Sequence, residues 1–281
     1  MIPAAFDYTV PASLEEAIQA LAGGGEDAKL LAGGHSLIPL MKLRLAAPSL
    51  LIDLRKVQGL QGVERENGSW RIGALTPHAR LEHSPELGLV SRVAGTIADP
   101  QVRNRGTIGG SLAHGDPASD LPAAMLVCEG TVTLQGPGGQ RTVAAADLFQ
   151  DYLETAVAAD EVLTEIRIDA LQGYGYGYEK FNRRSEDWAM VAVSAVVKES
   201  GGTCEDVRIG LTNMSSVPLR ASAVEDALRG QSLSPENIER AAEQAAEGLD
   251  PPADLNASAE YKRHLARVLC KRALQTAAGG G

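Results

Sequence analysis

A pair of adjacent glycines between two apolar stretches, in LLAGGHSLIPLMKLRL at residues 30–45, constrains the fold of this chain most strongly. Glycine has no Cβ, so it turns tightly and lets another group approach the backbone closely. The residues before the pair favour a strand and those after it favour a helix. A strand, a tight turn and a helix are therefore expected here. Such a turn is either purely structural or a cradle for an anionic cofactor.

A second segment, RGTIGGSLAHGDPASDLPA at residues 105–123, repeats the pattern of two glycines followed closely by a serine. Both segments follow a β-prone stretch, and both place a hydroxyl beside backbone N–H groups that we expect to be exposed. Successive N–H groups in such turns form a concave anion site without any lysine. Two such segments suit the pyrophosphate of a larger cofactor. The chain has neither a P-loop nor a G-x-G-x-x-G motif after a strand, so a standard Rossmann nicotinamide site is not supported.

The composition excludes several classes of function. The net charge is −10 and no basic run occurs, which argues against nucleic acids and anionic membranes as partners. The first 20 residues lack the pattern of a secretory signal, and no apolar run is long enough to cross a membrane. The three cysteines, Cys128, Cys204 and Cys270, are too few and too dispersed for an iron–sulfur cluster or a disulfide framework. A cytoplasmic protein is expected.

Periodicity and turn residues predict a small α/β unit over about residues 1–55. Ser13 and Glu16 form a capping box before a helix, and AKLLA at 28–32 predicts a short strand. A helix over 36–45 and a strand over 49–54 complete the unit.

Beyond residue 55, we expect a strand and a helix, then a long functional loop over 99–122, because long loops inside compact domains are usually functional. A domain boundary is placed near residue 172, after which two or three helices close the chain. Further strands are predicted in a hairpin at 131–143 and at 161–168, 189–197 and 206–214.

The two glycine segments resemble the FAD-binding signatures of the medium subunit of molybdenum-containing hydroxylases. The opening MIPAAFDYTVPASLEEAI and the segments IADPQVRNRGTIGG and IGLTNMSSVPLRA also fit, so the resemblance covers nearly the whole chain. It is closest to the medium subunits of aerobic carbon monoxide dehydrogenases. The resemblance implies an α+β fold: a two-part FAD-binding domain of the PCMH/vanillyl-alcohol-oxidase type, then a smaller domain with an antiparallel sheet and helices. The expected bounds are 1–172, with subdomains of about 1–55 and 56–172, and 173–281.

The resemblance also implies where FAD is held. The first segment would surround the pyrophosphate, the second would clamp it, and Asp120 suits ribose or ribityl hydroxyls because a carboxylate accepts hydrogen bonds. Ile97 and Leu163 would contact the rings, while Lys180 and Trp188 would approach the isoalloxazine. Ser111 stands where many relatives have asparagine. Trp188 stands where close relatives have tyrosine. The implied cofactor-binding residues are Leu31, Ala32, Gly33, Gly34, His35, Ser36, Leu37, Ile97, Thr107, Gly109, Gly110, Ser111, His114, Asp120, Leu163, Lys180 and Trp188.

As a function, the resemblance implies an FAD-carrying electron-transfer subunit, most closely that of aerobic CO oxidation. A large partner would hold the molybdenum cofactor and a small partner two 2Fe-2S clusters, in a dimer of heterotrimers. The acceptor would be a quinone, and the complex would meet the inner face of the membrane only peripherally. The same subunit in an N-heterocycle or aldehyde hydroxylase, with NAD as a possible acceptor, is the main alternative. A non-catalytic nucleotide-binding assembly protein and a self-sufficient flavin oxidase are weaker alternatives.

Several other residues are expected to be structural. His78, His83 and His264 lie in polar helical stretches and are expected on the solvated surface. Arg103 and Arg105 suit a phosphate contact or a surface loop equally. Asp53 reads as a hydrogen-bonding residue at a strand end, Cys128 as a buried small hydrophobe, and Trp188 fits the core nearly as well as the flavin.

Overall fold

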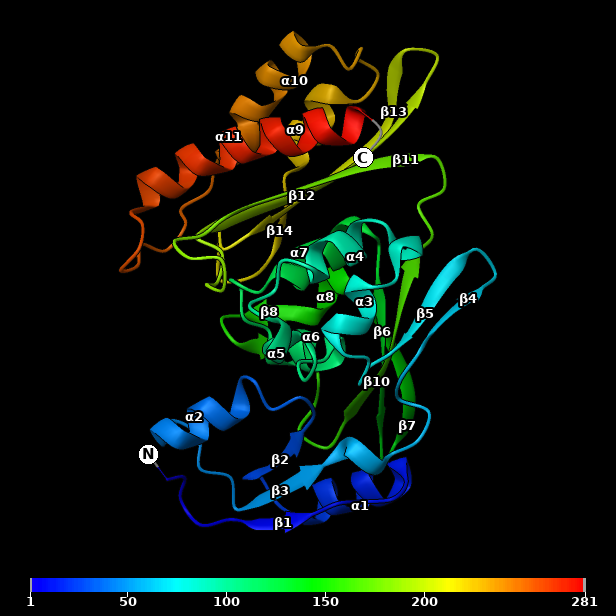
Figure 1. The fold of residues 1–281 in the computed structure, drawn as a ribbon, viewed down its shortest axis with the longest axis vertical. Helices are drawn as coiled ribbons and strands as arrows, with labels where there is room; N and C mark the ends of the chain where they lie inside the picture. The colour runs from blue at the N-terminus through cyan, green and yellow to red at the C-terminus, as the bar shows by residue number, and fades with distance from the viewer. Residues whose placement is uncertain (1, 280–281) are drawn as a thin grey trace.

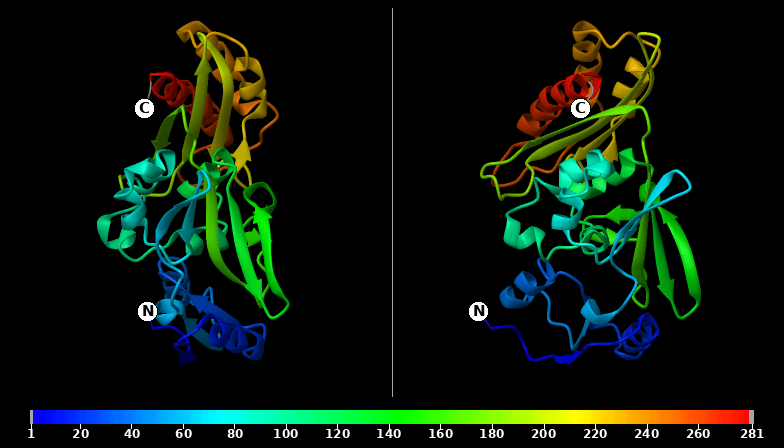
Figure 2. Two further views of the ribbon diagram at one scale, coloured as in Figure 1. Left: turned by 90° about the vertical axis from the view of Figure 1, so that its right-hand side faces the viewer. Right: turned by 45° about the vertical axis from the view of Figure 1, so that its right-hand side comes forward.

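The computed structural model describes residues 2–279, which form three units stacked along the long axis of the molecule (Figures 1 and 2). The first unit is a parallel three-stranded sheet in the order β1-β3-β2. Ser13 caps α1 by accepting a hydrogen bond from Glu16 N–H, as the capping box predicts. The elements of this unit are β1 (Asp7–Thr9), α1 (Leu14–Gly23), β2 (Ala28–Leu31), α2 (Leu37–Leu43), β3 (Leu50–Asp53) and η1 (Leu54–Lys56).

The middle unit is built on a five-stranded antiparallel sheet in the order β4-β5-β10-β6-β7, with short helices gathered on one side of it (Figure 1). Its strands are β4 (Val63–Glu66), β5 (Ser69–Gly73), β6 (Thr131–Gly136), β7 (Gly139–Ala144) and β10 (Val162–Asp169), with a separate pair β8 (Phe149–Asp151) and β9 (Glu154–Thr155). Its helices are α3 (His78–Glu82), η2 (Pro85–Leu87), α4 (Leu89–Ala94), α5 (Pro100–Arg103), α6 (Ile108–His114), α7 (Asp120–Val127) and α8 (Ala145–Leu148).

The prediction of a long loop over residues 99–122 is wrong in one respect, because most of this segment is helical. Asp99 caps α5 by accepting from Val102 N–H, and Thr107 caps α6 by accepting from Gly110 N–H. Each helix is too short to show a hydrophobic period, and its capping residues and glycines resemble those of a turn. The sequence pattern therefore concealed both helices.

The last unit is an antiparallel sheet, β11-β12-β13-β14, covered on one face by the long helix α11 and on the other by α7 (Figure 1). Alternate residues of β12 face opposite sides of the sheet. One set packs into the core of the middle unit and the other into the core beneath α11, which explains the unbroken apolar run of this strand. The elements are β11 (Tyr174–Phe181), β12 (Val191–Ser200), β13 (Thr203–Thr212), β14 (Leu219–Arg220), α9 (Ser222–Leu228), α10 (Pro235–Ala242), η3 (Glu243–Ala246) and α11 (Ala259–Ala278).

Glycines allow the close contact on both faces of this sheet. A Cβ on Gly177 would lie 2.1 Å from the carbonyl oxygen of Ala273 in α11, and one on Gly210 would lie 2.4 Å from that of Ala123 in α7. The mixed helix and antiparallel-sheet content confirms the expected α+β class. The junction between β10 and β11 contains the position at which the domain boundary is expected.

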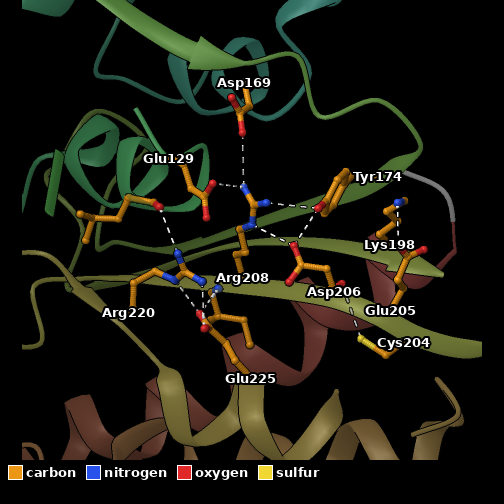
Figure 3. A network of polar contacts seen from close by, with 12 residues as sticks. Glu129, Asp169, Tyr174, Lys198, Cys204, Glu205, Asp206, Arg208, Arg220 and Glu225 are labelled. Atoms are coloured by element: carbon orange, nitrogen blue, oxygen red, sulfur yellow. Dashed lines mark hydrogen bonds and ion pairs between the residues drawn. The ribbon is translucent and has the colours of Figure 1, made fainter. Parts of the chain in front are cut away.

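A polar network also joins the last sheet to the middle unit (Figure 3). Arg208 of β13 pairs with Asp206 at 2.9 Å and reaches Glu129, just after α7, at 3.4 Å. Arg220 pairs with the buried Glu225 at 2.6 Å and donates to the carbonyl of Leu126.

Candidate functional site

A cleft of about 560 Å³ opens where the three units meet, a volume typical of small-molecule sites. The structure brings every residue of the expected cofactor site to this one cleft. Its walls include Leu31, Ala32, Gly33, Gly34, His35, Ser36, Leu37, Ile97, Thr107, Gly109, Gly110, Ser111, His114, Asp120, Leu163, Lys180 and Trp188.

The first glycine segment presents free backbone donors to the cleft. β2 ends at Leu31, and Gly34 takes a φ of +79°, a conformation that side chains other than glycine rarely adopt. Within residues 2–279, the N–H groups of Gly33, Gly34, His35 and Ser36 make no hydrogen bond. Consecutive unpaired N–H groups of this kind form an anion-binding nest.

Gly33 has a second reason to lack a side chain. A Cβ there would lie 2.2 Å from the carbonyl oxygen of Arg105 and 2.8 Å from Cα of Gly106. The two glycine segments therefore cross backbone to backbone. This crossing fixes the first segment against the second at the wall of the cleft.

The second glycine segment differs from the first, and the expectation that its N–H groups are exposed is wrong. Gly109 N–H donates to the Ala74 carbonyl at 2.8 Å, Gly110 N–H to Thr107 Oγ1, and Ser111 N–H to the Thr107 carbonyl. The pair follows no strand but forms the first turn of α6, where those donors are used internally. The Ser111 hydroxyl is hydrogen-bonded to that of Ser119 at 2.7 Å.

A buried ion pair from two units forms another wall. Lys180 of β11 lies 2.9 Å from Asp120, the first residue of α7, and also donates to the Thr96 carbonyl. Tyr178, two residues earlier on the same face of β11, donates to the other Asp120 oxygen at 2.7 Å. Burial raises the pKa of Asp120, although Lys180 and Tyr178 oppose that shift. Each Asp120 oxygen thus already accepts one hydrogen bond.

The remaining lining is mostly apolar, with one aromatic side chain at the rim. Ile97 and Leu163 supply flat apolar wall, and Leu163 is almost fully buried. Trp188 is 55% exposed, so the alternative that it belongs to the core is wrong. An indole at the rim is available to stack on a planar ring.

The cleft also contains a histidine that the sequence analysis placed on the surface. His78 is only 5% exposed and lines the cleft, so that expectation is wrong. Burial, with His35 and Arg103 nearby, lowers the pKa of His78 to about 4. The polar stretch around His78 concealed its burial, because α3 turns His78 inward together with Leu81 while His83 stays exposed.

The structure also places the remaining residues for which a structural role was expected. Asp53 accepts hydrogen bonds from Tyr8 and from Arg55 N–H at its strand end, and Cys128 is fully buried, as expected. Arg103 pairs with Glu82 at 2.8 Å and is not a free phosphate contact. His264 is exposed.

Residues 2–279 lack two further features. None of their helices combines the length and apolarity needed to span a membrane. No group of three or more His, Cys, Asp or Glu residues among them is arranged to hold a metal ion.

The cleft suits a dinucleotide. The unpaired N–H groups of the first segment match an anionic centre, and the apolar walls and rim indole match planar rings. Comparisons with known proteins agree with this fit. Residues 4–170 match the family described as "FAD binding domain in molybdopterin dehydrogenase", and residues 176–277 match "CO dehydrogenase flavoprotein C-terminal domain".

Full-length relatives share this architecture. The carbon monoxide dehydrogenase medium chain of Hydrogenophaga pseudoflava is 43% identical, covering 99% of this chain and 98% of the relative. The nicotine 6-hydroxylase medium subunit of Paenarthrobacter nicotinovorans is 40% identical, covering 96% of each. A solved structure of the H. pseudoflava carbon monoxide dehydrogenase superposes with a TM-score of 0.96 at 45% identity, covering 99% of both chains. The chain therefore belongs to the FAD-binding medium subunits of the molybdenum hydroxylases, the flavoprotein subunits of the carbon monoxide dehydrogenase and xanthine dehydrogenase family of oxidoreductases.

Proposed function

We propose that this chain holds FAD in the cleft and transfers electrons from partner iron–sulfur clusters to an external acceptor during aerobic oxidation of CO to CO2. The run of unpaired N–H groups from Gly33 to Ser36 supports this proposal most strongly, because it offers an anionic pyrophosphate several backbone donors at once. The 43% identity to a carbon monoxide dehydrogenase medium chain supports CO as the substrate.

Each wall of the cleft then has a role. Gly33 to Ser36 would hold the pyrophosphate, with Ala32, Leu31 and Leu37 beside them. Thr107, Gly109, Gly110 and Ser111 would support that segment from α6, while Asp120 would use its remaining acceptor capacity toward sugar hydroxyls. His114, Ile97 and Leu163 would border the rings. Lys180 and Trp188 would lie beside the isoalloxazine. Lys180 would interact with it through its charge, and Trp188 would stack on it.

Bound FAD supplies the redox chemistry, since it exchanges electrons both singly and in pairs. The protein side chains need only position the cofactor, exclude water and set its potential. This division requires no acid–base catalysis by the side chains of the cleft.

The assembly that we propose is a heterotrimer, paired into a dimer. A large subunit would carry the molybdenum cofactor and oxidise the substrate, and a small subunit would carry 2Fe-2S clusters. A quinone would accept the electrons, at the inner face of the membrane, which the complex would approach only peripherally. The first domain would comprise residues 1–172 and the second 173–281.

Isolation of the tagged chain from its native host, followed by anaerobic exposure to CO, tests this proposal. We expect a large and a small subunit to co-purify and the flavin absorption band to bleach under CO. A complex that bleaches with an N-heterocycle but not with CO would contradict the CO assignment while leaving the subunit's role intact. The 40% identity to a nicotine 6-hydroxylase subunit makes this second substrate class the one to test.

A further inference from the structure

His78 is the buried titratable group of the cleft that the proposed function does not use. It begins α3, and its backbone N–H donates to the Gly106 carbonyl at 2.9 Å. The backbone of His78 is therefore anchored to the crossing of the two glycine segments. Both His78 and Gly106 line the cleft.

The two nitrogens of the His78 ring have different surroundings. Nδ1 is sealed from solvent and has no hydrogen-bond partner within the described part of the chain. Nε2 is not among the sealed atoms, and its ring edge faces Gly106: a Cβ on Gly106 would lie 2.8 Å from Cδ2 and 3.0 Å from Nε2. Nε2 is thus the nitrogen at the wall of the cleft.

This asymmetry selects one tautomer. A proton on Nδ1 would leave a buried N–H donor without an acceptor, which is costly. A proton on Nε2 leaves only a lone pair in the sealed position and directs the donor toward the cleft. Because the pKa of His78 is lowered to about 4, the ring is neutral near pH 7, and this single N–H is what it can offer a ligand.

We propose that His78 is a further cofactor-binding residue, whose Nε2–H donates a hydrogen bond to a phosphate oxygen of the bound dinucleotide. Gly106 lies against the ring and is also the residue that Gly33 abuts, and His35 is near enough to help lower the pKa of His78. The donor thus shares one part of the cleft wall with the unpaired N–H groups of Gly33 to Ser36. Together these neutral donors would surround the anion. Arg103 is paired with Glu82. The inference rests on the proposed FAD site and extends it by one residue.

Two substitutions separate this role from simple packing. In His78→Gln, the amide Nε2 can take the place of the imidazole Nε2. In His78→Asn, the amide reaches only the position of Nδ1 and withdraws from the cleft. His83→Gln is the matched control, because His83 directly follows the same helix and is exposed.

The measurement uses the purified complex, stripped of flavin and titrated with FAD and separately with ADP, which has the pyrophosphate but no flavin ring. Dissociation constants are read from fluorescence, and thermal unfolding of the stripped forms is recorded. We expect His78→Asn to weaken FAD and ADP alike, by about tenfold or more, as for loss of a hydrogen bond to a charged oxygen. His78→Gln and His83→Gln should bind as the unmodified protein does.

Equal affinity of His78→Asn and the unmodified protein would overturn the inference, and so would an equal loss in both His78 variants. A loss for FAD without a loss for ADP would also contradict the assignment to the phosphates. If the unmodified complex binds FAD while any of these three results occurs, only the role of His78 fails. If the unmodified complex binds no flavin, the proposed function itself fails.

Discussion

The glycines of the cleft serve different physical purposes, although the sequence presents them as two similar pairs. Gly34 supplies a positive φ, whereas Gly33 permits a backbone crossing. Gly109 packs on Ala74, where a Cβ would lie 2.5 Å from the alanine Cβ. Gly110 has a helical conformation, and a Cβ there would meet only Thr107 Oγ1 at 2.8 Å and Ala32 at 3.6 Å. Substitutions at these positions should therefore differ in their effects.

Gly33→Ala should be the most damaging of the small substitutions. Its Cβ would clash with the Arg105 carbonyl, and backbone cannot rotate away as a side chain can. We expect a loss of about 1–3 kcal/mol in the free energy of unfolding, measured with urea, together with weakened FAD binding. Gly138→Ala, in the open hairpin turn, is the control and should change neither quantity. Normal FAD binding by Gly33→Ala would show that the crossing does not shape the site.

At the scale of the element, α6 depends on its cap. Thr107 is buried, and its hydroxyl accepts from Gly110 N–H, satisfying a donor that the helix itself cannot. Thr107→Val keeps the side-chain shape but removes this acceptor, and should lower the free energy of unfolding by about 1 kcal/mol. Thr107→Ser keeps the hydroxyl and should retain most of the stability. Thermal unfolding of both variants checks this, and equal stabilities would contradict the capping role.

The sequence predicted the elements that carry an apolar stretch or an alternation bounded by turn residues. The strand and glycine turn at residues 28–36 and the hairpin at 131–143 lie where they were expected. The short helices α5 and α6 could not be found, because a helix of one or two turns shows no apolar period. The burial of His78 was missed for a related reason: its inward direction depends on tertiary packing against Gly106, which leaves no local pattern.

In the whole molecule, the third unit is attached to the middle unit partly through ion pairs of Arg208, whose side chain is largely buried while its partners across the junction are exposed. Arg208 reaches Glu129 and Asp169 across the junction and is hydrogen-bonded to Asp206 and Tyr174 (Figure 3). Near the cleft, Lys180 and Asp120 make the equivalent contact. The cleft wall thus depends on how the last sheet docks.

Arg208→Met should lower the free energy of unfolding at pH 7 by about 1–3 kcal/mol, because the partly buried Asp206 loses its charged partner and the exposed Glu129 loses a weaker one. Burial alone raises the pKa of Asp206, but Tyr174 and Arg208 outweigh burial and hold that pKa below its ordinary value. A lowered carboxyl pKa contributes stability above the unfolded value of about 4, and that contribution disappears as the pH falls through the folded pKa. The difference between variant and parent should therefore shrink in acid.

Lys198→Met is the control for Arg208, because its pair with Glu205 is solvent-exposed on both sides. Such pairs contribute about 0–1 kcal/mol. If Lys198→Met lowered the free energy of unfolding as much as Arg208→Met does, the location of Arg208 at the junction between the two units would be unimportant.

Lys180→Met should be more costly, at about 3–5 kcal/mol, because it leaves the Asp120 charge buried without a cation. The double variant Asp120→Asn, Lys180→Met removes that charge and should recover part of the loss. Urea unfolding of the two variants measures the difference. Equal stability of the single and double variants would show that the pair is not a coupled buried charge.

FAD that the cleft holds by hydrogen bonds and packing should leave the protein when the native complex is denatured. The purified native complex is precipitated with acid, and the flavin in the supernatant is identified and counted by chromatography against the amount of this chain. We expect FAD, rather than FMN, in an amount equimolar with this chain. A fully assembled complex that releases no flavin would contradict this expectation.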